Sequence, residues 1–181
     1  MAAKGNREKW IDSGYEYFGQ IGPASLNVER LSMIVGLNRS SFYHYFSDTQ
    51  IFETFLLEQH VDLFRELGVQ LEACEAFKPD LLNLLLSLKK QMAFHRQLLI
   101  HESVPRYKEC FLKAKSFTES RTYELWSRHN HLDGDRNDQL SLYTVIRDFY
   151  LVHYDQTDAT EVSATLNSIH SLFHGHEIPH A

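Results

Sequence analysis

Polar side chains that can donate hydrogen bonds are concentrated between residues 39 and 46. Side chains three and four positions apart share one face of a helix, so this segment predicts a short helix with a polar outer face. Phe42 and Phe46 would lie on the opposite face and suit a buried core. A dense set of donors on an exposed helix can contact the edges of base pairs in the major groove of DNA. The donors are Arg39, Ser40, Tyr43 and His44.

The preceding residues predict the elements that hold this helix in place. Asn27 can cap a first short helix from about Val28, because its side-chain oxygen can accept a backbone N–H. Gly36 can adopt the left-handed conformation that ends that helix, and Asn38 can cap the next one. Two short helices joined by a glycine turn make a helix-turn-helix unit, whose second helix enters DNA. The first helix should bury the face formed by Val28, Leu31, Ile34 and Val35.

This stretch of sequence resembles the N-terminal domain of TetR-type transcriptional regulators. The shared pattern is Val28-x-x-Leu31-x-x-x-x-Gly36-Leu37-x-x-x-x-Phe42-Tyr43-x-Tyr45-Phe46-x-Asp48. The upstream segment fits the family's first helix, because Gly22 can end it after an apolar face. That face consists of Trp10, Ile11, Gly14, Tyr15 and Phe18. The resemblance covers about residues 6 to 60, and its several parts occur together at the expected spacing.

The resemblance implies an all-α protein of two domains. Residues 1–47 would form a three-helix helix-turn-helix domain that binds DNA. Residues 48–181 would form a helical domain that binds a small effector molecule and dimerises, giving about nine helices in all. The alternative from the residues alone is a small helical bundle with no role in DNA binding.

The resemblance and the polar face together predict which residues contact DNA. We expect Arg39, Ser40, Ser41 and His44 to face the major groove beside the cap Asn38, and Tyr43, Tyr45 and Thr49 to hold phosphates. Arg39 is the best candidate for a bidentate contact to guanine. Many relatives have a lysine at the position of Thr49 and a histidine at that of Tyr45. The free N–H groups at the start of the next helix would also attract a phosphate.

The charge of the N-terminal domain predicts modest affinity for DNA. The whole chain has a net charge of -6, yet residues 1–50 carry five basic and five acidic side chains. A neutral domain gains little from the release of counterions on DNA, so we expect weak or salt-sensitive binding. The charged side chains are Lys4, Arg7, Lys9, Arg30 and Arg39 against Glu8, Asp12, Glu16, Glu29 and Asp48.

The remainder of the chain is predicted to be helical. A long helix capped by Ser47 or Asp48 would link the two domains. The helix after it should start at Pro79 and, being apolar nearly all round, lie buried at the centre of the second domain. The expected helices are 48 to about 73, 79 to about 94, a short segment 98–101, 105–128, about 139–154 and about 159–174, with a loop at 131–137.

The last two helices are predicted to form a homodimer. The final one has a stripe of Val162, Leu166, Ile169 and Phe173, and its neighbour at about 139–154 is apolar on more than one face. Such helices can pack against the same pair of a second subunit, as the resemblance also implies. The alternative is that both stripes only stabilise the monomer. A symmetric dimer would suit a palindromic operator.

The effector is implied by the resemblance and not by particular residues. TetR-like proteins bind small molecules among their middle helices, and this region is rich in aromatic side chains, although aromatic residues at helical spacing are more often plain core. His95 and His101 could be pocket groups or satisfied core residues. The most favoured function is therefore a ligand-responsive repressor, and the alternatives are a DNA-binding or partner-binding scaffold without an effector and, more remotely, an enzyme.

Other classes of site are not expected. Phosphate loops, nucleophile elbows and paired-carboxylate patterns are missing, so no catalytic residue or cofactor is predicted. The histidines at 170, 174, 176 and 180 have no cysteine or carboxylate at metal-ligand spacing, so we predict no metal. Cys74 and Cys110 are interpreted as reduced thiols, with a redox pair as the alternative. The sequence has neither the apolar core of a signal peptide nor a membrane-spanning run, which predicts a cytoplasmic protein.

Overall fold

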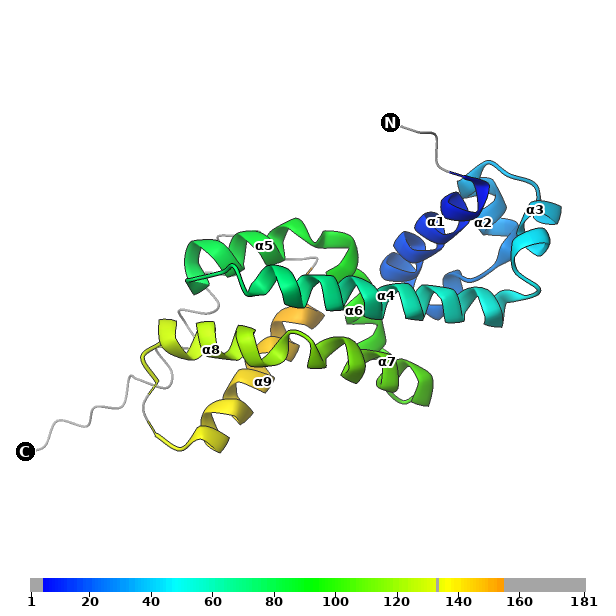
Figure 1. Cartoon of the computed structure of the whole chain (residues 1–181). Helices are drawn as coiled ribbons and strands as arrows, with labels where there is room; N and C mark the ends of the chain where they lie inside the picture. Colours follow the sequence, from blue (N-terminus) through cyan, green and yellow to red (C-terminus); the bar gives the residue numbers. More distant parts are fainter. Residues whose placement is uncertain (1–4, 133, 155–181) are drawn as a thin grey trace, which may run out of the picture.

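The computed structural model describes residues 5–132 and 134–154, which form helices and no strand (Figure 1). The predicted all-α fold is therefore confirmed. A 3₁₀ turn, η1 (Pro23–Ser25), follows the first helix, and a π-helical segment, η2 (Phe77–Leu81), follows the fourth. The α-helices are α1 (Asn6–Ile21), α2 (Val28–Val35), α3 (Arg39–Tyr45), α4 (Thr49–Leu71), α5 (Leu82–Ser87), α6 (Lys89–Ile100), α7 (Pro105–Ser116), α8 (Glu119–His129) and α9 (Arg136–Val152).

Side-chain caps define the boundaries of the helix-turn-helix unit. Asn27 Oδ1 accepts a hydrogen bond from the N–H of Arg30 at 3.0 Å, and Asn38 Oδ1 accepts one from Ser41 at 2.8 Å. Gly36 has a φ of 71°, so it ends α2 in the left-handed conformation that favours glycine. The starts of α2 and α3 and the turn between them are those predicted from the sequence.

Aromatic side chains fill the core beneath the helix-turn-helix unit. Trp10, Phe42, Phe46 and Phe52 are fully buried, and the ring of Phe42 contacts the other three at centroid distances of 5.2–5.3 Å. The rings come from α1, α3 and α4 and from the residue that follows α3. Phe42 thus connects the predicted recognition helix to its two supports.

One residue of the predicted buried face of α2 is exposed. Val28 and Leu31 are buried, whereas the side chain of Ile34 is 50% exposed. Two steps of three residues place Ile34 about 120° around the helix from Val28, beyond the face that packs inward. The prediction that Ile34 is buried is wrong.

The helix-turn-helix unit is joined to the rest of the molecule by two helices. α4 runs from α3 into the second half of the fold (Figure 1), and α6 packs closely along α1. A Cβ atom on Gly19 of α1 would lie 3.1 Å from the backbone nitrogen of Phe94, so the two backbones approach each other closely. Gln97 Nε2 donates to the carbonyl oxygen of Gly19 at 3.3 Å, and Lys90 forms a 2.5 Å ion pair with Glu16.

The middle of the chain is more broken than predicted. The helix expected from Pro79 to about 94 divides at Leu88, where ψ is 35°, into α5 and α6. No residue of α5 is buried, so the central position belongs to α6 and the predicted burial of the first half is wrong. The helix expected over 105–128 divides at Phe117, whose carbonyl oxygen and Cβ lie against Gly68 of α4. The contact between Phe117 and Gly68 joins residues far apart in the sequence, so the spacing of apolar residues could not predict the break in the helix.

The first of the two predicted C-terminal helices is present as α9. α9 begins three residues before the expected start at 139, because Asp135 Oδ1 accepts a hydrogen bond from the N–H of Asn137 at 2.7 Å. The predicted final helix at 159–174, with its apolar stripe and histidines, lies outside the described residues. Within the described part of the chain, no helix is long and apolar enough to cross a membrane.

Candidate nucleic-acid interface and regulatory cavity

The predicted recognition helix exposes most of its polar face. α3 lies at the end of the molecule opposite α8 (Figure 1), with Asn38, Arg39, Ser40, Tyr43 and His44 exposed to solvent. The side chain of Tyr43 is 56% exposed although its ring touches that of Phe42. The structure thus brings these predicted residues together on one surface.

Three other predicted contact residues are only half-buried. Trp10 Nε1 donates a hydrogen bond to Ser41 Oγ at 3.3 Å, which ties this hydroxyl to α1. Tyr45 packs against the core and contacts the ring of His44 at 4.9 Å. Thr49 is the first residue of α4. These side chains border the exposed face of α3 and help to fix it.

The start of α4 offers less to a phosphate than the sequence suggested. Asp48 Oδ1 accepts hydrogen bonds from the backbone N–H groups of Gln50 and Ile51, both at 2.8 Å. The capping carboxylate therefore occupies the groups that were expected to attract an anion.

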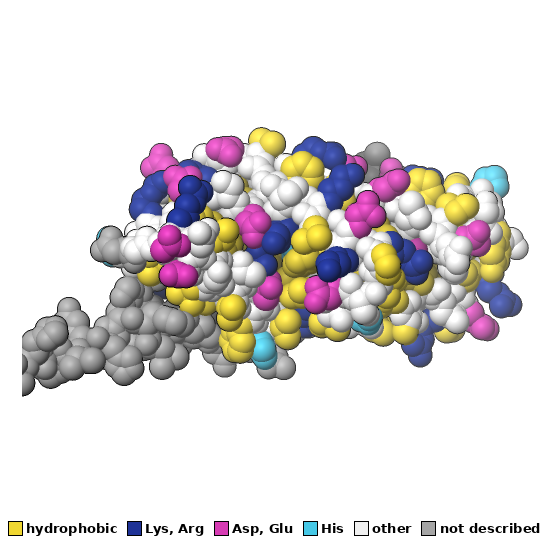
Figure 2. Space-filling view, turned by 90° about the horizontal axis from the view of Figure 1, so that it is seen from below, with side chains coloured by type: hydrophobic (Ala, Val, Ile, Leu, Met, Phe, Trp, Pro, Cys, Tyr) yellow, Lys and Arg dark blue, Asp and Glu magenta, His cyan; other side chains and the backbone are white. Residues whose placement is uncertain are grey.

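Charges of both signs are mixed on one face of the molecule. On the face shown in Figure 2, Lys and Arg side chains alternate with Asp and Glu side chains. The guanidinium group of Arg7 lies 4.7 Å from the ring centroid of Phe55, so this cation packs against the protein. Arg7 therefore has a packing role within the protein besides its charge.

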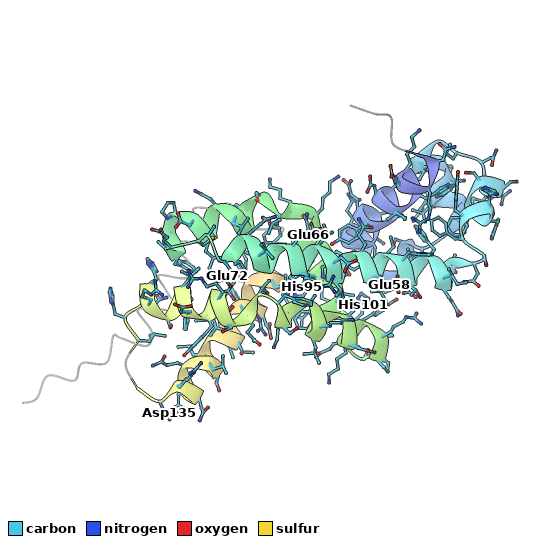
Figure 3. All side chains as sticks on the ribbon, in the orientation of Figure 1. Glu58, Glu66, Glu72, His95, His101 and Asp135 are labelled. Carbon is cyan, nitrogen blue, oxygen red and sulfur yellow. The ribbon has the colours of Figure 1, made fainter. Side chains whose placement is uncertain are left out.

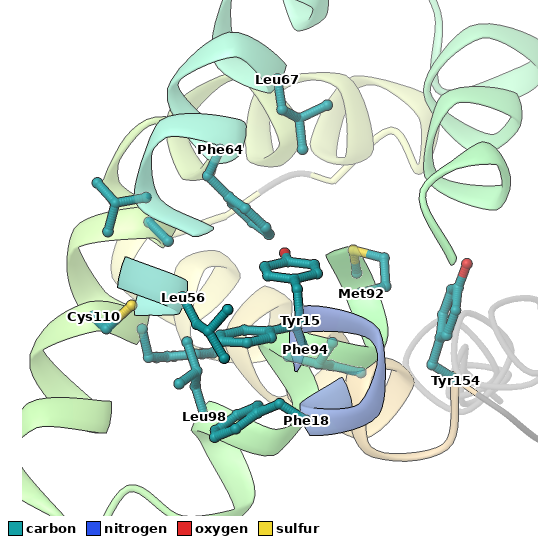
Figure 4. Close-up of a cluster of buried hydrophobic side chains, with 14 of the residues drawn as sticks. Tyr15, Phe18, Leu56, Phe64, Leu67, Met92, Phe94, Leu98, Cys110 and Tyr154 are labelled. Atoms are coloured by element: carbon teal, nitrogen blue, oxygen red, sulfur yellow. The ribbon is translucent and has the colours of Figure 1, made fainter. Parts of the chain in front are cut away.

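A second candidate site is a partly open cavity far from α3. Its volume is about 110 Å³, and α4, η2, α5, α6, α7, α8 and α9 contribute to its walls. Most of the surrounding side chains are apolar, and three of them, Phe64, Leu67 and Met92, are labelled in the buried cluster of Figure 4. The other apolar side chains of the lining include Trp126, Ile146 and Leu151.

One wall of this cavity carries a charged network. Glu119 pairs with Lys115 at 3.0 Å and with Arg147 at 2.6 Å, and Arg147 also pairs with Asp148 at 2.7 Å. Lys115, Glu119 and Arg147 line the cavity, whereas Asp148 does not. The Tyr143 and Thr122 hydroxyls, which lie 2.5 Å apart, are further polar groups of the lining.

His95 lines the cavity from α6 and is almost fully buried. Its ring is stacked with those of Phe64 and Phe111, each at 4.4 Å, and its Nδ1 lies 3.0 Å from Nε2 of His60. Burial lowers the pKa of His95 well below its ordinary value, and the nearby His60, Arg147 and Lys115 lower it further. Figure 3 shows His95 in the middle of the molecule. His95 is therefore both a pocket group and a hydrogen-bonded core residue, the two possibilities left open by the sequence.

The fold agrees with that of a solved protein. The structure is similar to the crystal structure of E. coli NemR in its reduced form, with a TM-score of 0.65 and 16% sequence identity, covering 91% of this chain and 94% of the NemR chain. The chain has the TetR-type fold. Neither a protein-family model nor a curated protein matches its sequence.

Sequence reasoning missed His60, the partner of His95 within this TetR-type fold. His60 is fully buried in α4 and falls in the same helical repeat as the neighbouring apolar residues Leu56 and Phe64. A histidine in an apolar repeat was the available signal in the sequence. Its hydrogen-bond partners are Tyr15 and His95, which lie 45 and 35 residues away, so the structure was needed to identify them.

The two cysteines of this chain, Cys74 and Cys110, are free thiols. Burial is the main factor that raises the pKa of Cys110, to about 12, and the pKa of Cys74 is also raised. Both thiols are therefore protonated at neutral pH, which disfavours reaction because the thiolate is the nucleophile.

Proposed function

We propose that this protein is a DNA-binding transcriptional regulator that acts as a dimer and responds to a small molecule. The observation that carries the proposal is the exposed polar face of α3, held by buried aromatic rings within a TetR-type fold. A two-turn helix with this outer face is suited to the major groove.

The exposure of each side chain suggests its role at the DNA. Arg39, Ser40 and His44 would contact base edges, and Tyr43 would hold a phosphate from the border of the helix. Tyr45 and Thr49 would add phosphate contacts beside it. The hydrogen bonds of Asn38 and Ser41 within the protein support a role in fixing the orientation of α3.

Substitution of Arg39 tests this arrangement. We expect Arg39→Ala to weaken binding to the preferred operator about tenfold to a hundredfold, because a bidentate contact to a base contributes most of the discrimination at its position. We expect Tyr43→Phe to weaken all sequences alike, since it removes a phosphate contact. An operator selected from random DNA and measured by fluorescence anisotropy at fixed salt would provide both values.

Arg136→Ala is the matched control, because Arg136 is exposed at the start of α9, in a different part of the fold. It should leave DNA binding unchanged. Equal losses for Arg39→Ala and Arg136→Ala would mean that only net charge matters, and no loss for Arg39→Ala and Tyr43→Phe would refute the role of α3.

The outer face of α9 supports dimerisation. Val145, Phe149 and Val152 lie along one side of this helix with exposed fractions of 67%, 47% and 40%. Several exposed apolar side chains on one helix are typical of an interface. We propose that α9 packs against α9 of a second copy, together with the predicted helix at 159–174.

Placing a charge on this face should separate the subunits. Val145→Glu is expected to shift the protein from a dimer to a monomer of 21.2 kDa in light scattering after gel filtration, because a buried unpaired carboxylate is costly. Val69→Glu is the control, since Val69 is 73% exposed on α4. A dimer that persisted in Val145→Glu would place the interface elsewhere.

The cavity supports a small-molecule effector. Its walls are largely apolar with a few polar groups, the usual composition of a ligand site. A scaffold without an effector is the alternative, and ligand-induced thermal stabilisation would distinguish the two.

A further inference from the structure

Three buried side chains form a continuous chain of hydrogen bonds through the middle of the molecule. The Tyr15 hydroxyl lies 2.7 Å from Nδ1 of His60, and Nε2 of His60 lies 3.0 Å from Nδ1 of His95. Each residue belongs to a different helix, α1, α4 and α6. We call this series the Tyr15–His60–His95 chain.

The Tyr15–His60–His95 chain joins the cavity to the helix-turn-helix unit. His95 lines the cavity, whereas Tyr15 does not and belongs to α1, which supports the recognition helix. The ring of Tyr15 is stacked on Phe94 of α6 at 4.3 Å, as Figure 4 shows. A change at His95 can therefore reach α1 through side chains in direct contact.

Hydrogen counting allows two directions for the chain. A neutral imidazole has one donor nitrogen and one acceptor nitrogen. If Tyr15 donates to Nδ1 of His60, then Nε2–H of His60 donates to Nδ1 of His95, and Nε2 of His95 carries a hydrogen. In the opposite direction both histidines carry their hydrogen on Nδ1, and Nε2 of His95 accepts. Burial keeps both rings neutral, because it lowers the pKa of His60 to about 3 and that of His95 as well.

We propose that a ligand oxygen accepting a hydrogen bond from Nε2 of His95 fixes the chain in its first direction and so couples the cavity to α1 through the Tyr15 hydroxyl. The proposal rests on the effector role of the cavity given above. A ligand can shift a conformational equilibrium only by interacting differently with the two states. A ligand acceptor meets this condition. It receives a hydrogen bond from Nε2–H of His95 in the first direction, whereas in the opposite direction the lone pair on Nε2 of His95 repels it.

The cavity also indicates the chemical class of the ligand. Its volume of about 110 Å³ is smaller than that of an enclosed apolar cavity of about 150 Å³ that binds benzene, but it is partly open to the surface, so a ligand with a single ring can enter without being fully enclosed. Lys115 and Arg147 at the wall already pair with Glu119, and Arg147 also pairs with Asp148, which does not line the cavity, so an anionic ligand would compete with these carboxylates for the two cations. The fitting ligand is an uncharged single-ring aromatic molecule with a carbonyl-type oxygen.

Nitrogen NMR of the histidine rings tests the direction of the chain in the full-length protein. Long-range ¹H–¹⁵N spectra distinguish a hydrogen on Nδ1 from one on Nε2. With acetophenone as the probe, both His60 and His95 should carry the hydrogen on Nε2. Hydrogens on Nδ1 of both rings in the complex would overturn the proposal.

Removal of the Tyr15 hydroxyl tests the coupling. Tyr15→Phe keeps the stacked ring and should weaken the binding of acetophenone about fivefold in calorimetry, although Tyr15 does not line the cavity. Tyr17→Phe in the same helix is the matched control and should bind like wild type. Cumene, which has a similar size but no oxygen, should bind both variants and wild type equally.

The outcomes separate this proposal from the proposed function. Equal acetophenone affinity in wild type and Tyr15→Phe, or no binding of acetophenone, would overturn the coupling or the ligand class even if the protein bound operator DNA normally. Loss of DNA binding in Arg39→Ala concerns α3 alone and does not bear on the ring tautomers.

Discussion

Phe42→Ala is expected to lower the free energy of unfolding by about 3–5 kcal/mol, the usual cost of deleting a buried phenylalanine ring. Phe42 is fully buried and contacts Trp10, Phe46 and Phe52. Its removal would leave a cavity between α1, α3 and α4 and would free the recognition helix from both supports. Urea unfolding followed by Trp10 fluorescence, in a Trp126→Phe background, measures this loss at fixed protein concentration.

The neighbouring residue provides the control for this experiment. Tyr43→Ala in the same helix should cost much less, because Tyr43 is 56% exposed. If both variants lost the same stability, the ring of Phe42 would not be the support of α3, and the packing described for this core would be wrong.

The helix-turn-helix unit could be predicted from the sequence because its determinants are local. Asn27, Gly36 and Asn38 each act on backbone groups within three or four residues, so their roles are visible in the order of the residues. The exposed donors on α3 follow from the same short spacing. The exposure of Ile34 was not predicted, because its spacing fits the apolar repeat although its angular position around α2 lies outside the buried face.

The interior of the second half could not be predicted in the same way, because distant residues determine it. The break at Phe117 depends on Gly68, and the environment of His95 depends on His60, which is 35 residues away. The sequence correctly indicated an aromatic, helical region. Which aromatic and polar groups surround a cavity depends on how α4, α6 and α9 pack.

The close packing of α1 on α6 changes how a signal could reach α3. The sequence suggested α4 as the link between the halves, and α4 does connect them. However, Gly19 brings the backbone of α1 against α6, and Tyr15 is bonded to α4, so α1 is held by both helices. A movement of the helix-turn-helix unit relative to the rest of the molecule therefore requires a change at the contact of α1 with α6 and at that of α1 with α4. The first contact involves Phe94, which precedes His95, and the second is the hydrogen bond between Tyr15 and His60.

Acid should destabilise this protein more than ordinary surface titration predicts. His60 has a pKa lowered to about 3 by burial, and the pKa of His95 is also low, chiefly for the same reason. In the unfolded chain both would have a pKa near the ordinary value of about 6.5. Below that pH the two histidines bind protons in the unfolded state but not in the folded state. Their contribution to the free energy of unfolding is therefore fully present above about pH 6.5 and is lost as the pH decreases toward 3.

The expected size of this effect follows from two protons. Each contributes about 1.4 kcal/mol per pH unit below 6.5, so lowering the pH from 7.5 to 5 should reduce the free energy of unfolding by about 4 kcal/mol. Urea titrations at several pH values measure this slope, and an exposed-site control, His44→Gln, should leave it unchanged. His95→Leu should remove about half of the slope. A free energy of unfolding that stayed constant from pH 7.5 to 5 would show that the two rings are not held neutral, and the direction of their hydrogen bonds would then lose its physical basis.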